Sequence, residues 1–169
     1  KLEAGIKTSF VTTDANAVYD TVSNGVIMRD YNRSNHFVYR ENINAAYVMF
    51  DTKLLERIKL VAGARFESSK QIMNSFADAG SDADVDRKYN DVLPSINLTY
   101  SPIEAINLRA AYSKTLARPE FRELASFTYF DFVANELVKG NPELTRSLID
   151  NYDLRLEHFG GAGELYAMG

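Results

Sequence analysis

The residues best suited to metal chemistry form an acidic run, Asp82-Ala83-Asp84-Val85-Asp86. A calcium-binding loop begins with the same D-x-D-x-D pattern, because closely spaced carboxylates supply the oxygen ligands that Ca²⁺ prefers. Such a loop also needs a glycine at its sixth position and a glutamate at its twelfth, and here those positions hold Arg87 and Leu93. The run is therefore predicted to be a solvated acidic loop, and no metal site is expected.

Catalytic chemistry has little support in the sequence. The two histidines, His36 and His158, lie far apart, and neither has a partner at metal-ligand spacing. No G-x-S-x-G, H-E-x-x-H or glycine-rich phosphate loop occurs. We therefore expect no catalytic residue and no cofactor, and an enzyme built on a barrel is the last of three hypotheses.

The most distinctive stretch runs from about residue 115 to residue 146. Its first part can form a short helical turn with Pro119 near the first position, and an aromatic cluster and a polar turn follow. Such a loop could contact a ligand, because aromatic rings beside arginine offer amphipathic surface. Packing of the loop on itself over the mouth of a barrel is the favoured alternative. The candidate residues are Arg118, Pro119, Glu120, Phe121, Tyr129, Phe130, Phe132, Gly140, Asn141 and Pro142.

The segments around this loop alternate in polarity with a period of two. In the segment 57–67, the even positions are Ile58, Leu60, Ala62, Ala64 and Phe66, whereas charged residues occur at odd positions. Successive side chains of a strand point to opposite faces, so this pattern predicts a strand with one apolar and one polar face. Similar strands are predicted over about 1–10, 36–50, 89–100, 106–114 and 147–158, and a seventh begins at Glu164.

The connections between these strands alternate between long and short. Long polar segments follow Phe10, Glu67 and Lys114, and short turns lie near residues 51–56, 101–105 and 160–163. In an up-and-down sheet, alternate connections lie at the same end, so all long loops share one side. Outer-membrane barrels have this asymmetry, with long loops outside and short periplasmic turns. The predicted fold class is all-β, an antiparallel up-and-down transmembrane β-barrel segment of about seven strands of a larger barrel.

The two predicted faces differ in chemistry. The polar face carries charges of both signs, which a solvated barrel lumen tolerates. The apolar face is predicted to include Tyr47, Tyr100, Tyr112 and Tyr152, which could belong to an interfacial girdle. The alternative is a half-buried antiparallel sheet in a soluble extracellular domain that acts in binding or adhesion.

Composition narrows the possible partners. The 169 residues carry a formal net charge of -4, which argues against nucleic acid as a partner because nucleic-acid binding usually selects a basic stripe. There is no cysteine and no run of 18 apolar residues, so we expect neither a disulfide scaffold nor a transmembrane helix. Both ends of the chain fall within strand-like runs. We therefore expect residues 1–169 to be part of a longer barrel.

Several motifs resemble the barrel of TonB-dependent receptors, in a style similar to the Bacteroidetes-type branch. They are Tyr39-Arg40-Glu41, Val61-Ala62-Gly63-Ala64-Arg65-Phe66-Glu67, Leu93-Pro94-Ser95-Ile96-Asn97-Leu98-Thr99-Tyr100, Asn107-Leu108-Arg109-Ala110-Ala111-Tyr112-Ser113, Arg118-Pro119-Glu120-Phe121-Arg122-Glu123-Leu124, Gly140-Asn141-Pro142-Glu143-Leu144 and Asn151-Tyr152-Asp153-Leu154-Arg155. The resemblance implies a 22-stranded barrel in the bacterial outer membrane, closed by an N-terminal plug, with TonB supplying energy. It implies uptake of an iron chelate, cobalamin or a glycan. Partners would be TonB, the plug domain, outer-membrane lipid and an unidentified ligand. Against this resemblance, residues 1–169 are expected to contain neither the plug domain nor the TonB-contacting box. The motifs transfer no ligand-binding residue.

Overall fold

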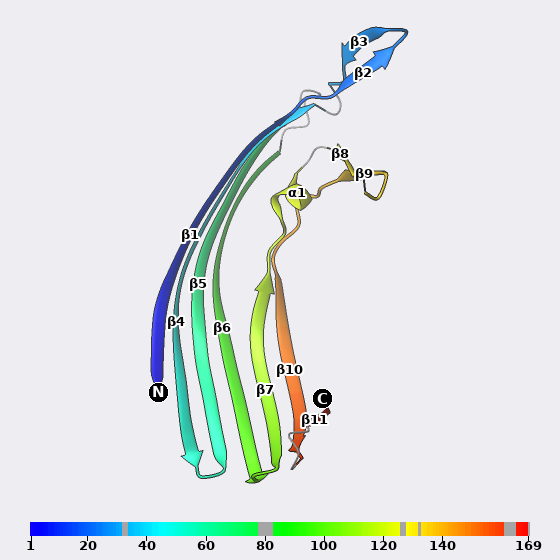
Figure 1. The fold of residues 1–169 in the computed structure, drawn as a ribbon. Coiled ribbons are helices and arrows are strands. Elements are labelled where there is room, and N and C mark those ends of the chain that lie inside the picture. Colours follow the sequence, from blue (N-terminus) through cyan, green and yellow to red (C-terminus); the bar gives the residue numbers. More distant parts are fainter. Residues whose placement is uncertain (32–33, 78–82, 126–127, 132, 161–164, 169) are drawn as a thin grey trace.

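The described part of the chain forms one long, curved antiparallel sheet (Figure 1). The computed structural model describes residues 1–31, 34–77, 83–125, 128–131, 133–160 and 165–168. The sheet has seven strands in the order β1-β4-β5-β6-β7-β10-β11. Their bounds are β1 (Leu2–Ala17), β4 (Asn35–Leu55), β5 (Ile58–Ala77), β6 (Ala83–Ile103), β7 (Ile106–Ala117), β10 (Ser147–Phe159) and β11 (Leu165–Met168).

Two small hairpins and one helical turn lie outside this sheet. Strands β2 (Asp20–Ser23) and β3 (Val26–Arg29) pair with each other, as do β8 (Thr128–Asp131) and β9 (Glu136–Lys139). The helical turn α1 spans Phe121–Leu124. Figure 1 shows all of them at one end of the sheet, opposite the short turns that join β4 to β5 and β6 to β7. The connections that follow β1 and β7 therefore lie at the end opposite the turns 55–58 and 103–106, as predicted. The connection between β5 and β6 is much shorter than predicted, and most of the predicted turn 160–163 lies outside the described residues.

The predicted strands all occur, but several are longer than expected. Strand β5 continues to Ala77 and β6 begins at Ala83, so the predicted loop 68–88 is mostly strand. Within it, Asp84 and Asp86 pair with β5 instead of forming a solvated loop, whereas Asp82 lies outside the described residues. The predicted loop 11–35 likewise contains the end of β1 and the β2–β3 hairpin. Both faces of these extensions carry polar residues, so the hydrophobic alternation disappears although the pairing continues.

The convex face of the sheet is apolar over its lower half, toward the short turns. On β5 the outward residues Ile58 to Phe66 cover about nine residues, close to the roughly 9–11 that a tilted barrel strand needs to cross a bilayer. Large apolar side chains on this face are solvent-exposed, among them Leu2, Ile6, Val92 and Leu154. A contiguous exposed apolar surface of this extent needs a nonaqueous neighbour, and lipid supplies it.

A polar row ends this apolar band on four neighbouring strands. The row consists of Thr8, Asn44, Ser68 and Asn90, which are successive partners in the register of β1, β4, β5 and β6. On β7 and β10 the boundary is marked by Tyr112 and Tyr152, whose rings lie 5.1 Å apart. Tyr112 donates its hydroxyl hydrogen to Asp150 at 2.7 Å, just above the band. The assignment of these tyrosines to an interfacial girdle stays a prediction.

Tyr47 does not belong to the apolar face, contrary to the prediction. In the register it is paired with Gly5 and Arg65, whereas Ala46 and Val48 continue the convex band. A Cβ atom at Gly5 would lie 2.6 Å from the Tyr47 ring, so the ring covers this glycine on the concave face. Both faces of this segment contain apolar residues, and the alternation alone therefore could not distinguish them.

The concave face of the lower half is charged. Glu157, which is 5% exposed, accepts a hydrogen bond from Arg109 Nε at 3.1 Å and lies 3.5 Å from Arg155. Asn107 also donates to the Glu157 carboxylate, at 3.4 Å. No helix in the described residues is long and apolar enough to cross a membrane.

Candidate functional site: the loop between β7 and β10

The connection from Arg118 to Arg146, here called the β7–β10 loop, carries every candidate site residue. Its first part turns into α1, and Pro119 lies two residues before the first helical residue, Phe121. The Glu120 backbone N–H donates to Glu123 Oε2 at 2.8 Å, and the Glu123 N–H donates to the Glu120 carbonyl at 3.0 Å. These bonds satisfy backbone groups that a helix start leaves unpaired.

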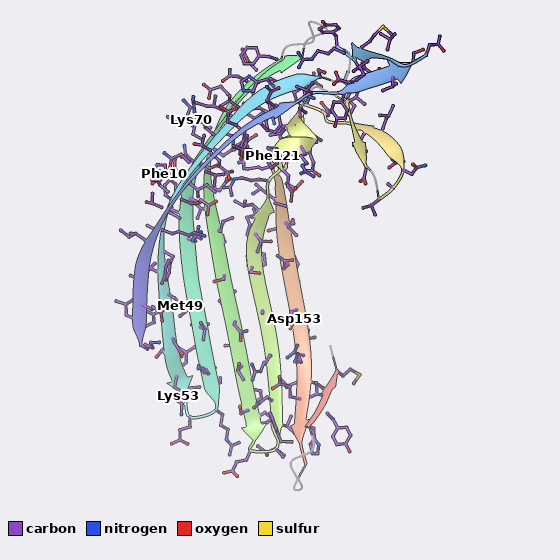
Figure 2. All side chains as sticks on the ribbon, turned by 45° about the horizontal axis from the view of Figure 1, so that its top comes forward. Phe10, Met49, Lys53, Lys70, Phe121 and Asp153 are labelled. Carbon is purple, nitrogen blue, oxygen red and sulfur yellow. The ribbon has the colours of Figure 1, made fainter. Side chains whose placement is uncertain are left out.

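The helical turn packs against the concave face of the upper strands. The Phe121 ring stacks on Phe37 of β4 at 5.5 Å between centroids and lies 6.1 Å from Tyr39. Leu124 is fully buried in the same cluster, beside Met73 of β5. Figure 2 shows Phe121 beneath the bent upper part of the sheet. The loop thus forms a hydrophobic core with the strands that extend above the apolar band.

The second part of the loop returns along α1. The Asn141 N–H donates to the Glu123 carbonyl at 2.6 Å. A Cβ atom at Gly140 would lie 2.4 Å from the carbonyl oxygen of Ala125, and 2.6 Å and 2.7 Å from those of Arg122 and Glu123. Only glycine allows this approach of the two backbones, because real Cβ atoms do not come so close to a carbonyl oxygen. Gly140 and Asn141 therefore hold the two arms of the loop together.

An arginine anchors the start of the loop to the sheet. Arg118 Nη2 donates to Glu67 Oε1 on β5, and Glu67 is 5% exposed. The other carboxylate oxygen of Glu67 accepts from Arg65 Nε at 2.9 Å. The first residue of the loop is thus bound to a strand two positions away in the sheet.

A second arginine anchors the end of the loop. Arg146 binds Asp91 of β6 in a bidentate manner, with Nε 2.9 Å from both carboxylate oxygens and Nη2 2.7 Å from one. Its guanidinium also lies over the Tyr89 ring, 4.3 Å from the centroid. Arg87 donates to the carbonyl of Pro142, which adds a third attachment. Bidentate arginine–carboxylate pairs are among the stronger hydrogen-bonded contacts in proteins.

The two carboxylates that receive these arginines are direct neighbours. Glu67 and Asp91 are partners in the register of β5 and β6, and both lie on the concave face. Like charges directly opposite each other destabilise a sheet. The loop supplies one arginine to each carboxylate, so its folded position removes this repulsion. The sequence placed both acids on the polar face but contained no local sign of their arginine partners.

The described part of the aromatic cluster belongs to the β8–β9 hairpin. The backbones of Tyr129 and Phe130 lie in β8 and pair with Val138 and Leu137 of β9, whereas Phe132 lies outside the described residues. In the turn that follows, Asp131 accepts hydrogen bonds from the backbone N–H groups of Val133 at 2.8 Å and Ala134 at 3.1 Å. The Ala134 N–H and then the Val133 N–H hold the pKa of the Asp131 carboxyl below its usual value.

The two histidines lie far from this loop's attachments and from each other. His36 Nε2 lies 2.8 Å from Asp14 Oδ1 on the neighbouring strand, and its ring stacks on Phe76. His158 lies 6.2 Å from the Tyr166 ring near the short-turn end. Across the described ranges, no group of three or more histidine and acidic residues is placed to hold a metal ion.

Comparison with known proteins matches this geometry to an outer-membrane fold. The structure of the alcaligin outer-membrane receptor FauA from Bordetella pertussis is similar, with 16% sequence identity and a TM-score of 0.52. The match covers 96% of this chain and 28% of that chain, so this chain spans little more than a quarter of its length. At such identity the likeness shows the fold alone. No curated protein sequence matches. The outer membrane protein β-barrel family matches residues 1–167, and the chain therefore belongs to this family of outer-membrane proteins.

Proposed function

We propose that the chain is the barrel portion of a TonB-dependent outer-membrane receptor for active uptake of a scarce or bulky ligand. The observation that carries the proposal is the β7–β10 loop, which is anchored by Arg118 and Arg146 and folds over the concave face. A loop bound across the mouth of a barrel suits a gated receptor better than an open pore. The likeness to a receptor barrel over 96% of the chain supports the same interpretation.

The sheet geometry supports a larger barrel. Strands β1 and β11 are the two ends of the sheet order, and each has one neighbour in the described structure. An unpaired strand edge is avoided in membranes because no water satisfies its backbone groups. We infer that further strands, a plug domain and TonB complete the receptor. The motif resemblance favours the Bacteroidetes-type branch and an iron chelate, cobalamin or a glycan as ligand.

Uptake by cells that produce the full-length protein tests this proposal. Growth on one of the three ligand classes should require the full-length protein and should be lost when TonB is removed. Replacing residues 126–139 by a short linker keeps both arginine anchors and should reduce uptake without reducing the amount of protein in the outer membrane. Uptake that continues without TonB would contradict the receptor proposal.

A soluble extracellular binding module is the alternative that the sequence left open. Membership of the outer-membrane family and the exposed apolar band disfavour it. Heat-modifiable mobility of the full-length protein on a denaturing gel separates the two. A barrel should migrate differently before and after boiling, whereas a soluble module should not.

A further inference from the structure

Strands β6 and β7 separate at the upper edge of the apolar band. Their pairing runs from Ile103 and Ile106 up to Ser95 and Ser113 and ends there. Above this point β6 continues to pair with β5, and β7 continues to pair with β10. The next residue of β6 above the last pair is Pro94, which has no N–H to donate to a neighbouring strand. The sequence thus contributes directly to the opening of this seam.

A cavity of about 440 Å³ occupies the seam, and its lining includes three basic side chains among polar and apolar ones. Arg65 and Arg118 line it together with Lys114. Glu67 is the acidic residue of the lining, and Asp150 lies 3.7 Å from Lys114 just outside it. Three cations against these two carboxylates leave one positive charge. The hydroxyls of Ser95, Ser113 and Thr115 complete its polar surface.

The arginines of the cavity keep unused hydrogen-bond donors. A guanidinium has five N–H donors. Arg118 uses Nη2 for Glu67, and its buried Nε has no hydrogen-bond partner in the part of the chain that the structure describes. Both oxygens of Glu67 are already occupied by Arg118 and Arg65. A buried donor without a partner is destabilising, so an acceptor that reached this Nε would be stabilising.

The hydroxyls can also donate. Thr115 Oγ1 accepts a hydrogen bond from Asn151 Nδ2 at 3.0 Å, which leaves its O–H free to point elsewhere. Lys114 lies on the convex side, 3.7 Å from Asp150, at a distance too long for a strong pair. Asp150 already accepts the Tyr112 hydroxyl at 2.7 Å. The seam therefore combines guanidinium, ammonium and hydroxyl donors, with the carboxylates of Glu67 and Asp150 as the competing acceptors.

We propose that the seam between β6 and β7 is a binding site for a phosphate group. The excess positive charge of the seam has the sign that favours a phosphate monoester, which carries roughly −1.5 to −2 at pH 7. Arginine guanidinium groups and hydroxyl groups can donate hydrogen bonds to the phosphate oxygens. Lys114 is the next outward residue above Tyr112, so the site lies at the membrane interface, within reach of a lipid headgroup and of a soluble phosphate. Strands of the barrel wall form this site, so the phosphate proposal does not depend on the proposed transport of a ligand.

Calorimetric titration of the full-length protein in micelles with inorganic phosphate tests the site. Lys114→Gln should weaken binding at least tenfold. Lys70→Gln is the matched control, because Lys70 also lies on the convex face, 3.7 Å from its carboxylate partner Asp86, but outside the seam. It should change the affinity less than twofold. Absence of saturable phosphate binding, or an equal loss in both variants, would overturn the proposal.

A second variant separates phosphate binding from the position of the loop. Arg118→Gln should weaken phosphate binding and should also expose the β7–β10 loop to protease. Lys114→Gln should weaken phosphate binding without changing the proteolysis pattern. If Lys114→Gln opens the loop as well, its effect on phosphate is indirect and the site assignment is wrong.

Lipid vesicles distinguish the source of the phosphate. The protein is reconstituted in phosphatidylcholine vesicles with and without phosphatidic acid. If phosphatidic acid abolishes binding of inorganic phosphate, a lipid headgroup occupies the seam. If inorganic phosphate binds equally in both, the site serves a soluble phosphate. Loss of TonB should leave either result unchanged, so a failed uptake proposal would not affect this test.

Discussion

The lower and upper halves of the sheet consist of the same paired strands but place apolar side chains on opposite faces. Below the row of Thr8, Asn44, Ser68 and Asn90, apolar residues point outward and charged residues line the concave face. Above this row, most outward residues are polar, with Phe10 and Phe76 as exposed exceptions, and Phe37, Met73 and Leu124 form a core on the concave face. The outward face of the lower half is suited to contact with lipid, and that of the upper half to contact with water. Continuous backbone pairing allows this reversal because it does not depend on which face is apolar.

The stabilising interactions of the two halves differ accordingly. The lower half has few buried apolar side chains of its own and relies on lipid to cover Ile6, Phe50 and Leu154, which are exposed in the isolated sheet. The upper half covers its apolar residues with the β7–β10 loop and neutralises Glu67 and Asp91 with arginines from that loop. Substitutions in the upper half should therefore act without a bilayer, and those in the lower half should depend on one.

The largest effect is expected from Asp91→Ala in the upper half. The substitution leaves Arg146 without its carboxylate partner. Breaking a buried ion pair lowers the free energy of unfolding by about 3–5 kcal/mol. We expect the lower end of this range because the Arg146 side chain is 23% exposed. Protease accessibility of the β7–β10 loop should rise in detergent and in bilayers alike. The matched control is Asp86→Ala on the same strand, because the Asp86 side chain is 66% exposed. Its loss should change the free energy of unfolding by less than about 1 kcal/mol. Equal proteolysis of the two variants would contradict the anchoring role.

Ala62→Arg should show the next largest effect, and only in lipid. It places a charge on the convex face of β5, where a midplane arginine costs about 2–4 kcal/mol. Equilibrium folding of the full-length protein into vesicles measures this free energy. Asn107→Arg is the control, because Asn107 lies on the concave face beside Glu157. The assignment of the two faces fails if both arginines impair folding to the same extent.

Gly140→Ala should weaken the upper half more modestly. The added methyl group would meet three carbonyl oxygens at 2.4–2.7 Å, and relief of such overpacking typically costs about 1–3 kcal/mol. Faster amide exchange at Asn141, whose N–H is bonded to Glu123, would report separation of the two arms. Lys139→Ala changes the exposed neighbour and should leave exchange unchanged. Unchanged exchange in Gly140→Ala would show that the arms do not need this close approach.

The smallest effect is a local pH dependence of the β8–β9 turn. The pKa of Asp131 is lowered by hydrogen bonds from Ala134 and Val133, so folding favours its charged form. The contribution is therefore present above the usual carboxyl pKa of about 4 and is lost as the pH falls through the lowered value. Amide exchange at Val133 and Ala134, compared between pH 5 and pH 3 after correction for intrinsic rates, measures it. In Asp131→Asn this pH dependence should disappear, and its persistence would contradict the assignment to Asp131.

Much of the lower half could be predicted from the sequence. The segment 57–67 alternates cleanly, since one face meets lipid and the other meets charged groups, and its face assignment is confirmed by the register. Tyr47 was assigned wrongly because its strand has apolar residues on both faces there. The upper halves of β5 and β6 were predicted as a loop because polar residues on both faces erase the period of two. Pairing between strands, which no local pattern reports, keeps them extended.

The sequence by itself determined the strands, their up-and-down order, the side on which the long connections lie and the family resemblance. These features depend on local alternation and on connection length, both of which are properties of neighbouring residues. Only the tertiary structure decided that Arg118 binds Glu67, that Arg146 binds Asp91 and that Gly140 lies against α1. These contacts join residues far apart in the chain, and their geometry follows from strand register and from the path of the loop. The same holds for the seam at Pro94, because a gap between strands exists only once the strands are placed side by side.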